Sequence, residues 1–257
     1  MKKMFVLALV VFVLAAIPAS AGWEKIRIGT EGAYPPFNWV DKNGELKGFD
    51  IDISKALCDA MKVKYEFVVQ DWDGLIPGLL AKKYDCIIAS MSMTPERRER
   101  VDFTNKYYQT PARFVARKGS GIEVSKSGLK GKVVGVQRAT THENFVRDKF
   151  GDSVTVKAYA TLDEADMDLV AGRVDLVLGD SVALIDALLN KPEGKDFEFI
   201  GPGYTDVAYF GDGIGIALRK GNPNLLEMFN KAIKQIRADG TYQKINAKYF
   251  DFDLYGD

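Results

Sequence analysis

One arginine of this chain has a setting suited to binding a carboxylate. Arg97 lies in the first turn of a predicted helix, because Thr94-Pro95-Glu96 places a proline at the first helical position. Its planar guanidinium can hold a carboxylate through two hydrogen bonds, and the N–H groups of a helix start are further donors. The alternative is a solvated charge within the run 96–100, and composition alone favours that alternative.

A repeated pattern brings in a second group of polar residues. Segments 83–90 and 173–180 each follow a helical pattern, begin with a basic residue, continue as an apolar run and end at Ser90 and Asp180. Buried strands preceded by helices are typical of parallel α/β sheets, which bind ligands beyond the carboxyl ends of the strands. A carboxylate at such a strand end needs a partner, so Asp180 either accepts hydrogen bonds from a ligand or caps the helix that begins at Ser181. The repeat predicts two similar lobes facing one cleft.

The elements that would position these residues alternate between helix and strand, which indicates an α/β fold. Capping boxes, in which a threonine is followed three residues later by glutamate, are predicted at Thr140 and Thr161. The segment 190–212, rich in glycine and proline, is expected to be a loop. Expected strands are 26–30, 65–69, 86–89, 132–137, 174–179 and 213–219; expected helices are 50–61, 161–172, 181–189, 222–240 and 241–249, with shorter ones after 73, from 94 and from 140.

Charge and composition exclude several classes of function. The 257 residues include 35 basic and 35 acidic side chains, a balance that offers no basic patch for nucleic acid or an anionic membrane. An apolar fraction of 47% is typical of a folded globular protein. His142 is the only histidine, so a histidine-based metal cluster is not expected, and neither is a cofactor. We place His142 at the edge of the cleft or behind it.

The first residues predict export. Lys2-Lys3 is followed by an apolar segment, 4–17, and by Ala19-Ser20-Ala21, the pattern of a signal peptide cleaved after Ala21. The apolar segment is shorter than the roughly 18 residues that a membrane span needs. Export makes a disulfide chemically possible, but Cys58 and Cys86 both stand in apolar patterns. We therefore favour two unpaired thiols in the core.

Several ordered motifs resemble one family. The stretch Ala89-Ser90-Met91-Ser92-Met93-Thr94-Pro95-Glu96-Arg97 is similar to a segment of the periplasmic solute-binding proteins for polar amino acids (solute-binding protein family 3), especially those for arginine or for lysine, arginine, ornithine and histidine. The similarity extends over essentially the whole chain after residue 21. Further matching motifs are Gly48-Phe49-Asp50-Ile51-Asp52, Trp72-Asp73-Gly74-Leu75-Ile76-Pro77, Phe210-Gly211-Asp212-Gly213, Asp239-Gly240-Thr241-Tyr242 and Lys248-Tyr249-Phe250.

The resemblance implies a fold and a function. The fold would be a two-lobed α/β periplasmic binding protein with two hinge crossovers: after a signal peptide at 1–21, lobe I is 22–109 and 213–257, and lobe II with the hinge segments is 110–212. The chain would be a monomeric periplasmic receptor, not an enzyme. It would capture a cationic L-amino acid, with arginine favoured over lysine, ornithine and histidine, and deliver it to an ABC permease. The alternatives are a dehydratase-like enzyme on the same fold and a ligand-sensing partner of a membrane receptor.

The resemblance also assigns the residues that would hold the backbone groups of an amino acid. Arg97 corresponds to the arginine that binds the ligand α-carboxylate, and Asp180 to the aspartate that accepts the α-ammonium. Ser90, Ser92 and the carbonyl of Ala89 would complete this recognition. The family often has serine at the position of Ala89, so one side-chain hydrogen bond is absent here.

Other positions would read the ligand side chain. Tyr34 and Trp72 match two aromatic residues that sandwich it, although core packing is the alternative for Trp72. Glu31 matches an acidic residue that reads a distal positive charge. The loop with Thr140 and Thr141 would add N–H groups and hydroxyls to the α-carboxylate, with helix capping as the alternative. The position of Gln137 varies with specificity in the family.

Overall fold

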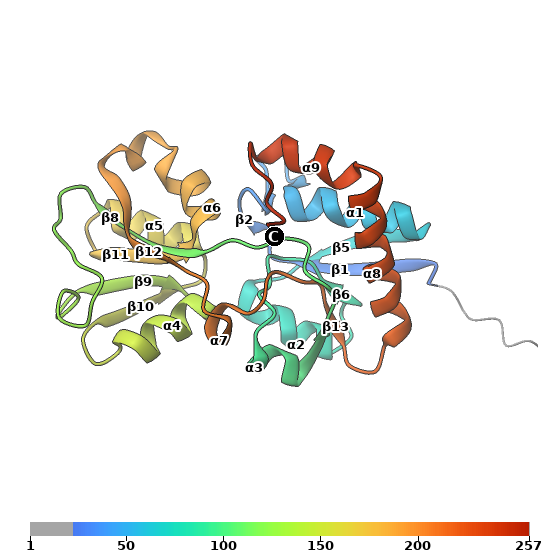
Figure 1. Cartoon of the computed structure of the whole chain (residues 1–257), viewed down its shortest axis with the longest axis horizontal. Helices are drawn as coiled ribbons and strands as arrows, with labels where there is room; N and C mark the ends of the chain where they lie inside the picture. Colours follow the sequence, from blue (N-terminus) through green and yellow to red (C-terminus); the bar gives the residue numbers. More distant parts are fainter. Residues whose placement is uncertain (1–22, 257) are drawn as a thin grey trace, which may run out of the picture.

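The computed structural model of the protein describes residues 23–256, and the predicted signal peptide lies outside them. Two lobes stand side by side, each built on a five-stranded sheet with helices around it (Figure 1). In the larger lobe the strand order is β5-β1-β6-β13-β7. Its strands are β1 (Lys25–Thr30), β5 (Lys64–Val69), β6 (Cys86–Ile87), β7 (Val101–Phe103) and β13 (Ala217–Arg219). A small sheet of β2 (Ala33–Tyr34), β3 (Asn38–Val40) and β4 (Leu46–Lys47) accompanies it.

The sheet of the second lobe has the order β10-β9-β11-β8-β12. Its strands are β8 (Ala112–Arg117), β9 (Val133–Gln137), β10 (Thr155–Tyr159), β11 (Leu176–Asp180) and β12 (Phe197–Tyr204). The helices of this lobe are α4 (Thr141–Phe150), α5 (Leu162–Val170), α6 (Ser181–Leu184) and α7 (Val207–Phe210). After α6 the helix widens into a π-helical turn, Ile185–Leu189, so the helix expected over 181–189 has two parts.

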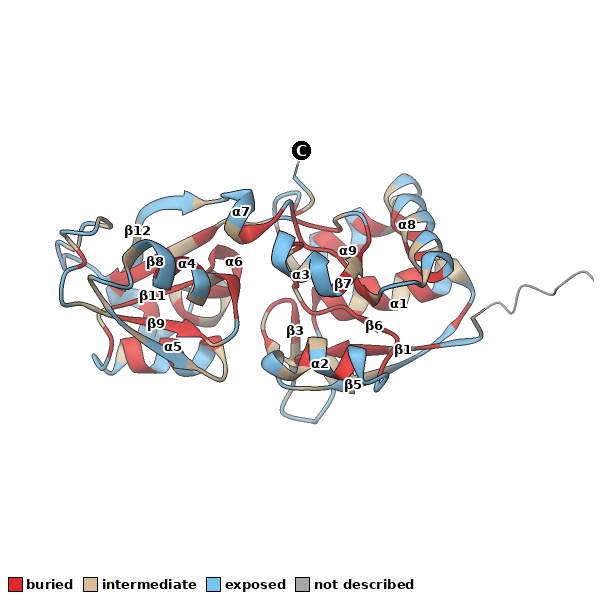
Figure 2. Cartoon of the chain, turned by 90° about the horizontal axis from the view of Figure 1, so that it is seen from below, coloured by how far each residue is buried: buried red, intermediate tan, exposed pale blue. Residues whose placement is uncertain are grey.

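Apolar helix faces explain how the larger lobe packs. Its helices are α1 (Phe49–Met61), α2 (Leu75–Leu80), α3 (Pro95–Arg100), α8 (Pro223–Ala238) and α9 (Thr241–Tyr249). In α8, Leu225, Phe229, Ile233 and Ile236 recur at helical spacing and are buried, which holds this helix against α1. Buried residues follow the strands and inner helix faces of both lobes (Figure 2). Cys58 and Cys86 are buried and unpaired, as predicted.

The sequence repeat corresponds to a structural repeat. β6 and β11 occupy the third, central place in their sheets, and each runs parallel to the neighbouring strand in second place, β1 or β9. An aspartate stands just before each central strand. Asp85 accepts a hydrogen bond from the Arg27 amide at 2.9 Å, and Asp175 accepts one from the Val133 amide at 2.8 Å. The ends of β6 and β11 therefore have equivalent positions and surroundings in their two sheets, as the repeat predicts.

Two expectations for the sheets were wrong. The sheets are mixed and not purely parallel, because β13 and β8 run antiparallel to the central strands. Each of these strands enters its lobe from the other lobe, so it runs away from the cleft while the central strand runs toward it. The segment 190–212 is also more than a loop: it contains β12 and α7. Strand β12 was missed because its glycines and proline weaken a strand pattern, whereas pairing with β8 stabilises it.

Two chain segments cross between the lobes. The first leads from β7 to β8 and the second from β12 to β13, as the green and orange traces at the centre of Figure 1 show. They pair with each other where Ile214 donates to the Tyr108 carbonyl at 2.9 Å and Tyr107 donates to the Ile214 carbonyl at 2.9 Å. Within residues 23–256, no helix is long and apolar enough to cross a bilayer.

Candidate ligand-binding site

The carboxyl ends of β6 and β11 face a cavity between the lobes. The predicted site residues line it together with His142: Glu31, Tyr34, Trp72, Ala89, Ser90, Ser92, Arg97, Gln137, Thr140 and Thr141. Asp180 lines an adjoining cavity that shares Tyr34, Ser90, Ser92 and His142 with the first. The two lobes thus bring all the predicted residues to two adjoining cavities, although these residues are up to 149 positions apart in the chain.

Arg97 is a positive charge held at the start of α3. The Thr94 hydroxyl caps this helix by accepting from the Arg97 amide at 3.2 Å, and the Arg97 guanidinium donates to the Ser92 carbonyl at 3.0 Å. The guanidinium lies over the ring of Trp72, 5.2 Å from its centre. Burial lowers the pKa of Arg97 to about 10. No carboxylate in residues 23–256 forms a salt bridge with it, so the site holds a cation that a ligand anion could neutralise.

Asp180 both ends β11 and caps α6. Its Oδ1 accepts hydrogen bonds from the amides of Val182 at 2.8 Å and Ala183 at 3.1 Å. Its Oδ2 accepts one from the hydroxyl of Thr110, a residue of the first crossing segment that no sequence motif marks. Burial raises the pKa of Asp180, while these hydrogen bonds favour the ionised form. The capping alternative is therefore observed, and it leaves the carboxylate beside the cavity.

Ser90 is fixed by a buried polar network. Its hydroxyl donates to Asp50 at 3.0 Å, and the same carboxylate accepts from Asn38 at 2.9 Å and from the Tyr107 hydroxyl at 2.8 Å. Burial raises the pKa of Asp50 to about 6. The backbone of Ser90 has φ 55°, in the left-handed region that few non-glycine residues adopt. With this turn at Ser90, the residues before and after it, Ala89 and Ser92, both line the cavity. Asp50 stands in a recognised motif, but nothing in the sequence placed it under Ser90.

An acidic residue lies at another part of the cavity. Glu31 is 6% exposed, and its carboxylate accepts a hydrogen bond from the Gln137 side chain at 2.6 Å. Gln137 also donates to the Ala160 carbonyl at 3.1 Å. Burial raises the pKa of Glu31 to about 7, although the bond from Gln137 opposes the shift. A buried carboxylate with such a pKa would be stabilised in its ionised form by a ligand cation.

The two threonines at the start of α4 differ in their bonding. The Thr140 hydroxyl donates to the Gln137 carbonyl at 2.6 Å and accepts from the Glu143 amide at 3.2 Å. The predicted capping box is only half formed, because Glu143 bonds to the Ala139 amide at 2.6 Å and not to that of Thr140. Local bonds thus occupy the Thr140 hydroxyl. Thr141 lines the cavity as the first residue of the helix.

His142 lies closer to the site than expected. It lines both cavities, and its ring is 5.8 Å from that of Phe210, between centres. Burial, together with the charge of Arg97, lowers the pKa of His142 to about 3, so the imidazole is neutral at ordinary pH. A neutral ring can pack against a cation without repelling it. Its position after two cavity threonines is the one signal that could have placed it here.

Comparison with known proteins identifies the family. Residues 26–252 match the family model of the bacterial extracellular solute-binding proteins, family 3. The chain belongs to this family. It is 48% identical to an L-arginine-binding protein of Pseudomonas aeruginosa (100% of this chain, 99% of the relative) and 44% identical to a lysine/arginine/ornithine-binding periplasmic protein of Escherichia coli (100% and 99%). A solved structure of an ancestral arginine-binding protein bound to arginine aligns with a TM-score of 0.82 at 40% identity, over 89% of this chain and 99% of that one.

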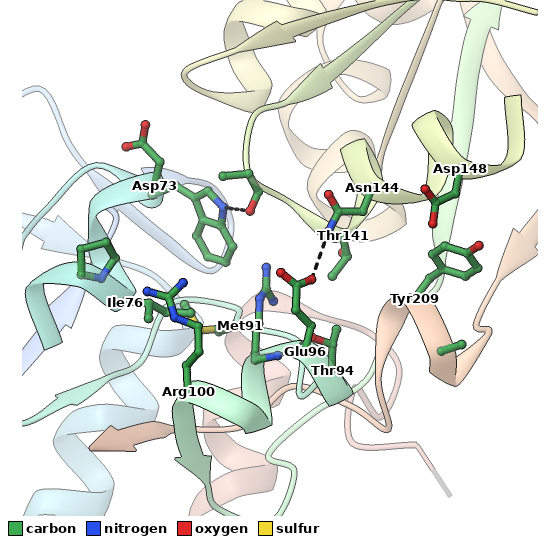
Figure 3. A pocket seen from close by; sticks show the side chains of 15 residues that line it. Asp73, Ile76, Met91, Thr94, Glu96, Arg100, Thr141, Asn144, Asp148 and Tyr209 are labelled. Carbon is green, nitrogen blue, oxygen red and sulfur yellow. Dashed lines mark hydrogen bonds between the residues drawn. The ribbon is translucent and has the colours of Figure 1, made fainter. Parts of the chain in front are cut away.

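The family fold is present in a closed arrangement. Trp72 donates from its indole nitrogen to the Ala139 carbonyl at 3.0 Å, and Arg138 pairs with Asp73 at 2.7 Å. A groove at the cavity mouth is bordered by Asp73 and Arg100 on one side and by Thr141, Asn144 and Tyr209 on the other, and there Asn144 donates to Glu96 at 3.4 Å (Figure 3). These bonds join the lobes directly. They close the cavity around the predicted residues.

The residue types at the cavity suit binding of a zwitterion with a charged side chain. Arg97, whose guanidinium has no salt bridge within residues 23–256, and the buried carboxylate of Asp180 come from opposite lobes, and a second carboxylate, Glu31, lines the same cavity as Tyr34 and Trp72. Within residues 23–256, no three histidine, cysteine or acidic side chains are grouped to hold a metal ion.

Proposed function

We propose that this protein is a periplasmic receptor that captures a cationic L-amino acid, arginine above lysine, ornithine and histidine. One observation carries the proposal: Arg97 from one lobe and Asp180 from the other border two adjoining cavities that share Tyr34, Ser90, Ser92 and His142. An amino acid has charges of opposite sign on its α-carboxylate and α-ammonium. Arg97 would bind the carboxylate and Asp180 the ammonium, so the ligand would join the lobes.

The groups around these two charges would complete the recognition of the amino-acid backbone. Ser90, Ser92 and the carbonyl of Ala89 lie at the same strand end and would supply hydrogen bonds to the ligand. Amides at the start of α4 near Thr140 and Thr141 would add donors for the carboxylate, since a helix start favours negative charge. The Thr140 hydroxyl itself would serve mainly as the helix cap.

The ligand side chain would lie between Tyr34 and Trp72, with its charge at Glu31. Each ring face would stabilise a desolvated cation by about 2 kcal/mol. Glu31 accepts one bond from Gln137, which would orient its second oxygen for the ligand. A guanidinium, which is planar and weakly hydrated, suits aromatic faces and a carboxylate better than an ammonium does. The chemistry of the guanidinium and the arginine-binding relatives together support arginine as the preferred ligand.

Capture would couple to transport through lobe closure. A ligand that touches both lobes favours the closed form by its difference in affinity for the two forms. We propose that an ABC permease recognises the closed monomer, that residues 1–21 direct export to the periplasm, and that the lobes comprise 22–109 with 213–257 and 110–212. The family's periplasmic relatives support this assignment.

Isothermal titration calorimetry tests the proposal. The purified protein, unfolded and refolded to remove any copurified ligand, is titrated with L-arginine, L-lysine, L-ornithine and L-histidine. L-Glutamate and D-arginine serve as controls for side-chain charge and for chirality. We expect tightest binding of L-arginine and none of L-glutamate. Absence of binding to all four cationic amino acids would refute the proposal.

A catalytic role is the second candidate, because a buried carboxylate with a pKa near 7, such as Glu31, could donate a proton. We favour binding, since pairing of Glu31 with a ligand cation accounts for the same carboxylate. Incubation with each amino acid followed by mass spectrometry distinguishes the two. A product that forms only with the intact protein, and not with Glu31→Gln, would favour catalysis.

A further inference from the structure

Asp180 is held from two directions, and only one of them belongs to the helix it caps. Val182 and Ala183 donate to Oδ1 from the first turn of α6. Oδ2 accepts from the hydroxyl of Thr110, seventy positions earlier in the chain. A carboxylate has about four acceptor positions, so these three bonds leave one for a ligand ammonium. The bond from Thr110 selects which oxygen and which direction remain.

Thr110 is part of the first crossing segment, and neighbouring bonds tie this segment to the end of β11. The Pro111 carbonyl accepts from the Ser181 amide at 3.0 Å. Ala112, the first residue of β8, pairs with Asp180 in the antiparallel ladder. The cavity that Asp180 lines is also bordered by Thr110 and by residues of the second crossing segment, including Gly213. Hydrogen bonds therefore join the first crossing segment to Asp180, the residue that we propose accepts the ligand ammonium.

We propose that Thr110 is a positioning residue for ligand binding: its hydroxyl holds the Asp180 carboxylate in the orientation that receives the α-ammonium, and so joins that charge to the hinge. This inference rests on the proposed function. It adds a residue that does not itself touch the ligand and that neither the motifs nor the helix cap required.

The physical reason is that a carboxylate at a cavity wall has competing orientations. Capping requires one oxygen near the α6 amides, but the second oxygen could rotate away from the cavity without the Thr110 donor. The hydroxyl also stabilises the ionised form, in opposition to burial, which raises the pKa of Asp180. An ionised and oriented carboxylate binds an ammonium more strongly than a neutral or misdirected one.

The test compares two ligands on four forms of the whole protein. Thr110→Val removes the hydroxyl at nearly constant volume, and Thr110→Ser keeps it. Thr155→Val is the matched control, since Thr155 is an exposed residue at the start of β10 that lines neither cavity. The ligands are L-arginine and 5-guanidinopentanoate, which lacks only the α-ammonium. Affinities come from calorimetry, at millimolar ligand for the analogue.

We expect Thr110→Val to weaken arginine binding about tenfold or more, as loss of a hydrogen bond to a charged group does. Thr110→Ser and Thr155→Val should bind like the wild type, and the affinity for 5-guanidinopentanoate should be the same in all four forms. Thermal unfolding checks that each variant folds, and Thr110→Ala replaces Thr110→Val if valine disturbs the crossing segment.

Two results would overturn the inference while leaving the proposed function intact. One is unchanged arginine affinity in folded Thr110→Val. The other is an equal loss for both ligands, which would indicate a general packing role for Thr110. If the wild type binds none of the cationic amino acids, the proposed function fails and the inference fails with it.

Discussion

The two central strands end in the same place within their sheets but deliver different chemistry. β6 and β11 each stand third in their sheet, each has a parallel neighbour on one side, and each follows an aspartate. Ser90 and Asp180 then follow at equal spacing. Ser90 has φ 55° and leads into a loop, whereas Asp180 has φ −60° and caps a helix at once. The same frame therefore supports a bend in one lobe and a helix start in the other.

Under the proposed function, the difference explains how a repeated scaffold would hold the two charges of a zwitterion. In the larger lobe the loop after Ser90 reaches the start of α3, and the charge is the guanidinium of Arg97. In the smaller lobe the strand end itself carries the charge, as Asp180. Two strand ends that both carried a carboxylate would present like charges, which cannot bind both ends of an amino acid. Divergence at the strand ends, not in the sheets, provides the complementary pair.

Removing the charge of the larger lobe should have the largest effect. Arg97→Ala leaves the ligand carboxylate without a partner, and loss of one member of a buried ion pair costs about 3–5 kcal/mol, a fall in affinity of about a hundredfold or more. Arg100 is in the same helix but borders the groove at the cavity mouth. Arg100→Ala should therefore change arginine affinity less than about threefold. Calorimetry with L-arginine measures both. Similar losses in the two variants would mean that the run 96–100 acts only as a charged surface.

The charge of the smaller lobe can be removed without removing the helix cap. Asparagine is as good a cap as aspartate, so Asp180→Asn should keep the melting temperature but lower arginine affinity about thirtyfold, as expected when a charged hydrogen bond is lost. Asp180→Ala should lose both the ligand contact and the helix cap, and loss of the cap should lower the free energy of unfolding by about 1 kcal/mol. Wild-type affinity in Asp180→Asn would leave capping as the only role of this residue.

A third prediction concerns a group that only the larger lobe provides. Burial raises the pKa of Glu31 to about 7, and a ligand cation favours its ionised form, so binding releases a proton below that pH. Arginine affinity should then fall as the pH drops below about 7, by up to about tenfold per pH unit. Glu31→Gln should bind about tenfold more weakly near pH 8 and lose this part of the pH dependence. Calorimetry across pH in both proteins checks it; parallel curves would contradict the role of Glu31.

The smallest effect is expected where the lobes touch outside the cavity. The Arg138 and Asp73 side chains are about two-fifths exposed, and an exposed pair of this kind changes an equilibrium by about twofold to fivefold. Arg138→Ala should therefore raise the rate of arginine release by that factor, because the closed form loses one direct bond. Stopped-flow displacement measures the rate, with Lys25→Ala, which removes an exposed pair within the larger lobe, as control. Equal rates in the two variants would show that this pair does not hold the lobes together.

The local parts of the fold could be predicted because their signals lie within a few residues. The start of α3 at Thr94-Pro95, the α5 capping box at Thr161 and the apolar faces of α1 and α8 follow from capping and helical spacing. Strands β8 and β12 were missed, since their stability comes from pairing with strands far away in the chain. Propensity describes a strand only when its partners are known.

For the candidate site too, local sequence patterns predicted only part of the structure. Motifs named the residues that would touch a ligand, but not those that hold them: Asp50 under Ser90 and Thr110 beside Asp180 act through bonds that span 40 and 70 positions. Nor did they show that Glu143 would bond to Ala139, which leaves the capping box of α4 half formed. Such contacts depend on how two chain segments meet, and no local pattern records that.

The sequence alone determined the α/β class, the repeat of the two strand ends, the start of the helix that carries Arg97 and the family to which the chain belongs. Only the tertiary structure decided that the returning strands run antiparallel, that the two crossing segments pair with each other, and that the hinge bonds to Asp180. The reason is physical: helix starts and apolar runs are encoded by neighbours in the chain, whereas strand direction and orientation across a cleft depend on packing between segments sixty or more residues apart.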